Sequence, residues 1–322
     1  MEEKLVNILN EMAEYLSIAQ MKKLQEVLLK NLVPDSIKQS ETTNEEYLKL
    51  FLDAKRIEGC SERTIQYYRT TAEHLLGQIK TPIRKMTTDE IRTYLVEYQQ
   101  TGHCSKVTVD NIRRNISSFF SWLEEEDYIL KSPMRRIHKI KTKTVVKEVI
   151  SDESMERLRD ACTELRDLAI IDLLYSTGIR VGELVQLNIS DVNLEQRECI
   201  VFGKGEKERR VYFDAKAKVH LSEYLASRSD DNPALFVTLD APYDRLKISG
   251  VEIRLRELGK RLSIERIHPH KFRRTMATRA IDKGMPIEQV QKILGHSQID
   301  TTMQYAIVNQ SNVKTSHRRY IA

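Results

Sequence analysis

The chain has 322 residues, of which 40% are hydrophobic and 31% charged, a composition that excludes fibrous and disordered proteins and a length that favours two domains. Fifty-two Lys and Arg residues against 47 Asp and Glu leave a net charge of +5, too small to identify a nucleic-acid partner by itself. No apolar run approaches the roughly 20 residues that cross a bilayer, and the acidic N-terminus is unlike a secretory signal. We therefore expect a cytoplasmic protein with no membrane partner.

Residues 3–32 have the spacing of an amphipathic helix, with apolar side chains at steps of three and four and a shift of phase near Leu24. Pro34 and the polar run after it break this pattern. Residues 1–41 are therefore expected to be a helix and a linker. The helix either docks on its own protein or mediates self-association, and its imperfect heptad pattern argues against a long coiled coil.

Residues 42–130 carry four successive helical patterns with short connections, which predict a small helical bundle. The expected helices cover 44–59, 61–77, 87–102 and 105–128. Asn44 is a candidate N-cap for the first helix, and Thr87 or Thr88 for the third.

Residues 131–147 are strongly basic, with seven Lys or Arg and no acidic residue. One interpretation is a solvated linker between domains. The other is a segment that crosses the phosphate backbone of a nucleic acid, because phosphate contacts require clustered positive charge. The second interpretation makes the DNA-binding candidates Arg135, Arg136, Lys139, Lys141 and Lys143.

Residues 148–322 have a mixed pattern that predicts an α+β domain dominated by helices. Helices are expected at about 152–162, 164–177, 215–228, 247–263, 270–283, 286–294 and 299–308. Between the second and third of them, "RECIVFGKGEKERRVYF" has β-rich arms around a glycine-bearing turn, which predicts a hairpin.

Arg180 and Glu183 lie in "TGIRVGEL", where one helix ends and the next begins. Glu183 is three residues after Arg180, so an ion pair between them could support the guanidinium, although the pattern alone is also typical of a structural pair. Lys204 lies at the predicted hairpin tip between two glycines, which permit a tight turn. The spacing of a nucleotide-binding phosphate loop is absent, and a lone lysine there is otherwise ordinary solvent-exposed charge.

His270 and Arg273 lie at positions i and i+3 near the start of a predicted helix, an arrangement that suits an anionic oxygen. His296 follows Gly295, and Tyr305 comes nine residues after that histidine. Each signal is weak alone, since HxxR is common by chance and most tyrosines on amphipathic helices pack in a core. Their order and spacing together are the informative feature.

Taken together, these segments resemble the tyrosine recombinase (phage integrase) family, in particular its Xer-like and mobile-element integrase members. The matching stretches are "TGIRVGELVQL", "GKGEKERRV", "HPHKFRRTMAT", "LGHS" and the tyrosine that follows. The resemblance implies a mainly helical chain with a small β component: a SAM-like helical core-binding domain (42–130), a basic interdomain linker (131–147) and an α+β catalytic domain (148–322).

The resemblance also implies the role of each site residue. Tyr305 would be the nucleophile, and the assisting residues would be Arg180, Lys204, His270, Arg273 and His296. The supporting role expected for Glu183 comes from its spacing to Arg180 and not from the resemblance. Arg274 departs from the family, because many members have a histidine there. It lies outside the catalytic set, so activity is still expected and only the local packing is in doubt.

The chemistry explains these residue types. A phenol with a pKa near 10 is a weak nucleophile at neutral pH and needs a base or a positive field. Two arginines suit the charge on a phosphorane-like transition state, a lysine can protonate the leaving 5′-oxygen, and histidine exchanges protons in both directions. The family's 3′-phosphotyrosyl intermediate retains the energy of the broken bond, so no cofactor or metal is expected. Cys60, Cys104, Cys162 and Cys199 are widely spaced and are expected to be free thiols.

By family analogy the partner is double-stranded DNA with an inverted-repeat core site. The working unit would be a homo-tetramer on two sites, or a hetero-tetramer with a paralogue, exchanging strands through a Holliday junction. Residues 306–322 either dock on a neighbouring subunit, pack on their own domain, or contact DNA through Arg318 and Arg319. The alternatives for function are a type IB topoisomerase-like relaxing enzyme and a non-catalytic DNA-binding accessory protein. The second is disfavoured because all six site residues are present.

Overall fold

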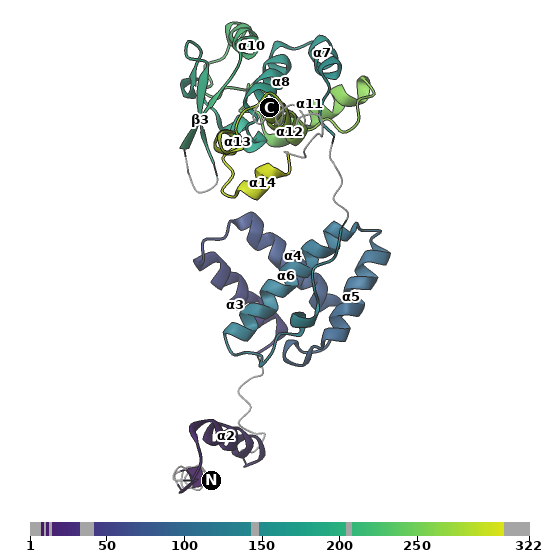
Figure 1. Ribbon diagram of the computed structural model, residues 1–322, viewed down its shortest axis with the longest axis vertical. Helices are drawn as coiled ribbons and strands as arrows, with labels where there is room; N and C mark the ends of the chain where they lie inside the picture. The colour runs from purple at the N-terminus through teal and green to yellow at the C-terminus, as the bar shows by residue number, and fades with distance from the viewer. Residues whose placement is uncertain are drawn as a thin grey trace, which may run out of the picture. The chain divides into compact units, whose positions relative to one another are not determined.

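The structure is a computed structural model that describes residues 8–9, 11–12, 15–32, 42–142, 148–203 and 208–305. The chain divides into two compact units, Met1–Thr144 and Val145–Ala322. Both are mainly helical, and the second also contains a small three-stranded sheet (Figure 1). The predicted fold class, mainly α with a small β component, is confirmed.

The N-terminal helical pattern is interrupted. Helix α2 spans Ile18–Leu32, and the three residues before it are not helical, with a turn at residue 15 and a bend at residue 16. At Ser17 the backbone N–H donates to the side-chain oxygen of Gln20 (3.0 Å), a local bond typical of a helix start. The single helix predicted over 3–32 is therefore wrong at this point, and the phase shift near Leu24 does not mark the break, because Leu24 lies inside α2.

Four helices form the core of the first unit, as predicted: α3 (Asn44–Ile57), α4 (Glu62–Gln78), α5 (Thr88–Thr101) and α6 (Lys106–Glu125). Phe51, Phe119 and Phe120 are fully buried between them. Each helix begins at a hydroxyl cap: Thr43, Ser61, Thr87 and Ser105 respectively.

The expected cap at Asn44 is wrong. The Thr43 hydroxyl accepts the backbone N–H of Glu46, and the Thr43 backbone N–H donates to the Glu46 carboxylate, which completes a capping box. Asn44 is instead the first residue of α3, and its side-chain oxygen accepts the backbone N–H of Ile83 (2.9 Å). The asparagine therefore fastens the short 3₁₀ turn η2 (Ile83–Lys85) to the bundle.

The basic segment after α6 begins inside the bundle. Its 3₁₀ turn η3 (Pro133–Arg136) buries Met134 in the same core. Further along, the backbone N–H of Ile140 donates to the buried carboxylate of Asp110 (3.0 Å). Residues 131–140, which were expected to be part of the basic interdomain linker, are held on the bundle because their apolar side chains pack there.

Helix α8 (Leu165–Thr177) lies in the interior of the second unit, with α10 (Ala215–Ala226) and α12 (Pro269–Asp282) packed against it (Figure 1). Its residues Ala169, Ile171, Leu173 and Leu174 are fully buried. A helix that is apolar around most of its circumference belongs in a core, which explains this central position. Gly178 ends α8 with φ +63°, a conformation that favours glycine.

The sheet consists of antiparallel strands β1 (Val192–Asn193), β2 (Glu198–Phe202) and β3 (Glu208–Tyr212), in that order. The pair β2–β3 is the predicted hairpin, with Val201 opposite Arg209. Strand β1 was not predicted, because two residues are too few to show a period. The alternation of β3 places Arg209 on the same face as the buried Val211.

The remaining helices of this unit are α7 (Asp152–Asp160), α9 (Val181–Gln186), α11 (Ile248–Arg261), α13 (Ile287–Leu294) and α14 (Ile299–Met303), with a 3₁₀ turn η4 (Ile189–Asp191). Helix α14 is shorter than the 299–308 expected. The N–H of Tyr305 donates to the carbonyl of Thr302 (2.9 Å), a tight i−3 turn that ends the helix, and residues 306–308 lie outside the described range. Among the residues the structure describes, no helix is long and apolar enough to span a bilayer.

Candidate active site

Arg273 is the buried centre of the candidate site. It lies in the first turns of α12 and is only 3% exposed. Its Nη1 donates to the carbonyl of Gly178 (2.7 Å), and its Nη2 donates to the carbonyl of Leu294 (2.6 Å). Both acceptors lie at helix ends, where carbonyl oxygens lack helical partners. The guanidinium therefore joins the end of α8 to the end of α13.

Burial, followed by the nearby positive charge of Arg180, lowers the pKa of Arg273 to about 10. The side chain is still cationic at neutral pH. A buried cation whose bonds go to neutral carbonyls retains most of its positive field for an anionic ligand.

Arg180 is held beside it at the start of α9. Its Nη1 donates to Glu183 Oε1 (2.9 Å), which is the ion pair predicted from the sequence, and its Nη2 donates to the carbonyl of Gly295 (3.2 Å). Arg180 is 37% exposed, whereas Glu183 is only 5% exposed. The arginine thus presents part of its guanidinium to solvent while the glutamate supports it from within.

Arg209 joins this group and was not singled out from the sequence. From β3, its Nη1 and Nη2 donate to Oε1 and Oε2 of Glu183 at 2.8 and 2.7 Å, and its Nε donates to the carbonyl of Ile293 (2.9 Å). Burial would raise the pKa of Glu183, but hydrogen bonds from Arg209 and from the Arg180 backbone outweigh it and lower the pKa overall. Glu183 is therefore a carboxylate anion.

His296 has a defined tautomer. Its Nε2 lies 2.9 Å from Arg273 Nη2, and its Nδ1 lies 2.8 Å from the hydroxyl of Thr302, which is fully buried on α14. A guanidinium can only donate, so Nε2 must carry the lone pair. The imidazole proton is consequently on Nδ1 and is donated to Thr302.

Both site histidines are uncharged at neutral pH. Burial lowers the pKa of His296, and Arg273, Arg180 and Arg209 lower it further, to about 4. Partial desolvation of its ring by the surrounding protein lowers the pKa of His270 as well, followed by the charges of Arg273 and Arg180. Because the folded protein keeps these histidines neutral, their contribution to the free energy of unfolding is fully present above the ordinary pKa near 6.5. For His296 this contribution is lost as the pH falls from there toward 4.

The Thr302 contact predicts a spectroscopic result. In nitrogen-15 NMR at pH 6, we expect His296 to be uncharged with a slowly exchanging Nδ1 proton, although an ordinary histidine would be mostly protonated there. Thr302→Val should lose this resonance to solvent exchange because the acceptor is gone, whereas Thr302→Ser should keep it. A resonance that persists unchanged in the valine variant would contradict the assignment.

Tyr305 lies next to His296. The two rings are stacked at a centroid distance of 6.1 Å with an interplanar angle of 27°. Tyr305 is half-buried and also packs against the small apolar cluster of Ala277, Val290 and Leu294. The nine-residue spacing seen in the sequence therefore corresponds to a turn and the short helix α14, which bring the tyrosine back to the histidine.

The other predicted site residues have different placements. His270 is exposed on the first turn of α12, three residues before Arg273. Lys204 and Lys143 lie outside the described residues. In the first unit, Arg135, Arg136, Lys139 and Lys141 are exposed, and Arg135 forms an ion pair with Glu124 (2.6 Å).

Arg274, which departs from the family pattern, has a structural contact. Its Nη1 donates to the carbonyl of Glu148 (2.9 Å). The arginine thus attaches the start of the second unit to α12, directly beside Arg273 in sequence. This hydrogen bond shows how Arg274 packs, which was in doubt from the sequence.

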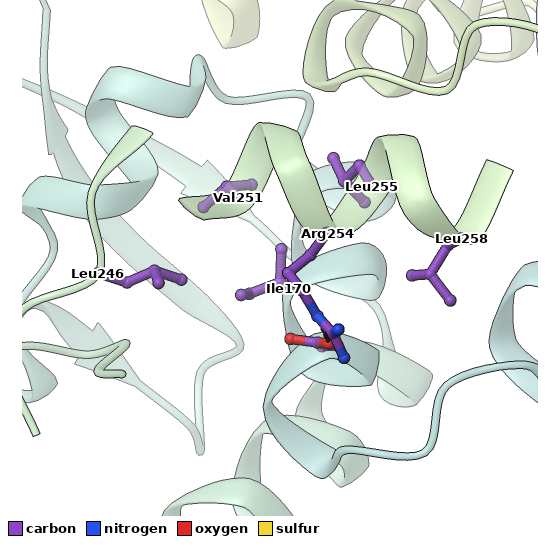
Figure 2. A pocket seen from close by; sticks show the side chains of 7 residues that line it. Ile170, Leu246, Val251, Arg254, Leu255 and Leu258 are labelled. Carbon is purple, nitrogen blue, oxygen red and sulfur yellow. Dashed lines mark hydrogen bonds and ion pairs between the residues drawn. The ribbon is translucent and has the colours of Figure 1, made fainter. Parts of the chain in front are cut away.

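The second unit also contains a pocket, which is too small to be an alternative site for a ligand. A pocket between α8 and α11 is lined by Asp167, Ile170, Leu246, Val251, Arg254, Leu255 and Leu258 (Figure 2). Its volume of about 10 Å³ holds no more than a single water molecule. Within the described parts of the chain, no group of three or more His, Cys, Asp or Glu residues could hold a metal ion.

The arrangement suits a phosphodiester. Arg180 and Arg273 supply positive charge from two neighbouring elements, a neutral histidine lies against Arg273, and the Tyr305 ring stacks on that histidine. Planar guanidinium groups match the oxygens of a phosphoryl group, and a tyrosine phenol is a side chain that can act as a nucleophile. The site thus has the groups needed for nucleophilic cleavage at phosphorus.

Comparison with known sequences agrees with this chemistry. Residues 148–312 match the profile described as "Phage integrase family", and residues 47–130 match "Phage integrase, N-terminal SAM-like domain". The second match identifies the class of the helical bundle. Together the two profiles cover the bundle and most of the second unit.

Individual relatives agree as well. The chain is 32% identical over 286 residues to tyrosine recombinase XerC of Thermodesulfovibrio yellowstonii, which covers 83% of this chain and 93% of that one. It is 29% identical over 291 residues to XerC of Oceanobacillus iheyensis, covering 85% and 95%. Among solved structures, the Tn1549 transposon integrase in complex with a circular intermediate DNA shares the fold, with a TM-score of 0.71 at 19% identity over 85% and 98% of the two chains.

Proposed function

This chain belongs to the phage integrase family of tyrosine recombinases, and we propose that Tyr305 is the nucleophile with which it cuts and rejoins DNA. The chain is a site-specific tyrosine recombinase, an enzyme that cleaves and rejoins DNA strands. The observation that supports the nucleophile is the stack of Tyr305 on His296, whose Nε2 accepts a bond from Arg273.

In the proposed reaction, the Tyr305 hydroxyl oxygen attacks the scissile phosphorus. The bond from phosphorus to the 5′-oxygen breaks, and a 3′-phosphotyrosyl link and a free 5′-hydroxyl form. Arg180 and Arg273 stabilise the charge on the non-bridging oxygens. Rejoining is the reverse: a 5′-hydroxyl attacks the phosphotyrosine and releases the phenol, so no external energy source is required.

Each proton has a proposed carrier. His270, which is neutral and exposed near the arginines, would accept the proton of Tyr305. Lys204 would donate a proton to the leaving 5′-oxygen. His296 has a different role. In the DNA-free protein its Nε2 accepts a hydrogen bond from Arg273, so it orients the arginine and has no proton there to donate to a phosphate.

The proposed partner is double-stranded DNA with an inverted-repeat core site. The structure of the Tn1549 integrase contains DNA, which supports a DNA partner for a chain with the same fold. We further propose the four-part division into 1–41, 42–130, 131–147 and 148–322, and a tetramer on two sites made of this chain alone or with a paralogue. Size measurement of the protein on DNA carrying one or two sites tests the stoichiometry.

The basic segment supports a prediction about salt dependence. Arg135, Arg136, Lys139 and Lys141 are exposed, so neutralising all four should flatten the slope of log affinity against log salt. The slope should fall by up to about 0.9 for each phosphate that the protein no longer neutralises. A variant that exchanges lysine and arginine at the same four positions keeps the charge and is the matched control. An unchanged slope in the neutralised variant would exclude these phosphate contacts.

Recombination and simple relaxation give different products. DNA that carries two copies of the recognised site should yield exchanged products, and plasmids without the site should stay supercoiled. Relaxation of site-free plasmids would favour a topoisomerase-like activity. Binding of the site without cleavage would favour an accessory protein.

A further inference from the structure

The Glu183 carboxylate is fully occupied by two arginines. Oε1 accepts from Nη1 of Arg180 (2.9 Å) and from Nη1 of Arg209 (2.8 Å), while Oε2 accepts from the Arg180 backbone N–H (2.8 Å) and from Nη2 of Arg209 (2.7 Å). A carboxylate offers about four lone-pair sites, so all of them are used. One negative charge is thus shared between two cations.

The two arginines share it unequally. Arg209 makes two parallel bonds with both of its terminal nitrogens and is only 12% exposed. Arg180 makes one side-chain bond to Glu183 and one to a backbone carbonyl, and it is 37% exposed. Parallel fork geometry is the stronger form of an arginine–carboxylate pair. Arg209 is therefore the main counter-ion of Glu183, and Arg180 is the cation that faces a ligand.

Arg209 also holds the segment that leads to His296. Its Nε donates to the carbonyl of Ile293 (2.9 Å), in the last turn of α13. Gly295 lies against the same side chain, because a Cβ added there would meet Arg209 Nε at 3.0 Å. Gly295 also has φ +64°, so both its conformation and its surroundings favour glycine. One side chain on β3 thereby connects α9 to the loop that carries His296.

We propose that Arg209 is a positioning residue that neutralises Glu183 and so leaves the charge of Arg180 for the scissile phosphate. Without Arg209, Glu183 would pair with Arg180 alone, and the positive field at the phosphate would fall. Lysine in its place would keep one charge but could not make the parallel pair of bonds. The inference rests on the proposed function, because the phosphate is the ligand that the freed charge would meet.

The test uses single-turnover cleavage by the full-length protein. The substrate is a nicked duplex built on the site that the wild-type chain selects from a random DNA pool. Arg209→Met should slow formation of the covalent adduct by about 100-fold, as expected when an electrostatic contribution is removed, and Arg209→Lys by about tenfold. The affinity for the duplex should change much less than the rate, since many other phosphate contacts remain.

Arg210 provides a matched control on the same strand. It points to the opposite face, is 60% exposed and pairs with Glu198. Arg210→Met and Arg210→Lys should stay within about twofold of the wild-type rate, as surface changes generally do. Thermal unfolding of every variant shows whether the fold is retained.

A double variant separates charge from packing. In Arg209→Met with Glu183→Gln, the anion is removed together with its counter-ion, so the rate should recover at least about tenfold over Arg209→Met alone. No recovery would mean that Arg209 acts only by packing, and would overturn the proposal. A wild-type rate in Arg209→Lys would overturn it too, and decides the question if the methionine variant does not fold. Absence of an adduct in the wild type would instead contradict the proposed function.

Discussion

Tyr305→Phe is expected to abolish the denaturant-resistant protein–DNA adduct on a nicked duplex. The change removes a single oxygen and leaves the ring that stacks on His296, so the fold and the DNA affinity should be retained. Loss of the attacking atom eliminates the covalent step altogether. Gel electrophoresis under denaturing conditions measures the amount of adduct. An adduct in the phenylalanine variant would show that another residue is the nucleophile.

The attachment point can be read directly. Trypsin should release residues 293–314 as one peptide, between Lys292 and Lys314, and Tyr305 is its single tyrosine. After nuclease digestion of the wild-type adduct, that peptide should carry the mass of a nucleotide remnant. Tyr212→Phe, a change at an exposed tyrosine on β3, should cleave normally and is the control.

Arg273→Lys is expected to reduce the rate of adduct formation by about 1,000-fold, the upper range for removal of one donor to transition-state charge. Lysine keeps the positive charge. It cannot bond to Gly178 O, Leu294 O and the His296 imidazole together in one plane, as the guanidinium does. The lysine variant should therefore fail both to hold the phosphate and to orient the histidine.

Single-turnover kinetics at saturating protein measures this effect, and Arg256→Lys, an exposed arginine on α11, is its control. If the rate of adduct formation falls by less than about tenfold in Arg273→Lys, the planar bonding of the guanidinium is not needed for catalysis. Because buried carbonyls lose their donors, the free energy of unfolding should also fall, by about 1–3 kcal/mol. Urea unfolding of the DNA-free protein separates that change in stability from the change in rate.

Most of the helices could be predicted from the periodicity of apolar residues, because a helix buried on one face repeats them every three to four positions. Helices α4 and α11 begin and end within about two residues of their predicted limits. The break at residues 15–17 and the burial of Met134 could not be predicted from the sequence. The first depends on a local side-chain bond at Ser17, and the second on a core contributed by other helices.

For the site, the order of the residues is visible in the sequence but their bonding partners are not. The ion pair of Arg180 with Glu183 follows from i to i+3 spacing, and the structure has it. Arg209 has a sequence signal that was not used: it alternates with Val211 on β3, whereas Arg210 points away. The tautomer of His296 had none, since it depends on Arg273 and Thr302, which approach from different helices.

The structure of the chain trapped on its nicked DNA site is the most direct test of the catalytic assignment. It should show phosphorus bonded to the Tyr305 oxygen, with the guanidinium groups of Arg180 and Arg273 donating to non-bridging oxygens of that same phosphate. If the two arginines instead lie apart with no phosphate between them, or if the phosphorus is attached to another side chain, the assignment is wrong.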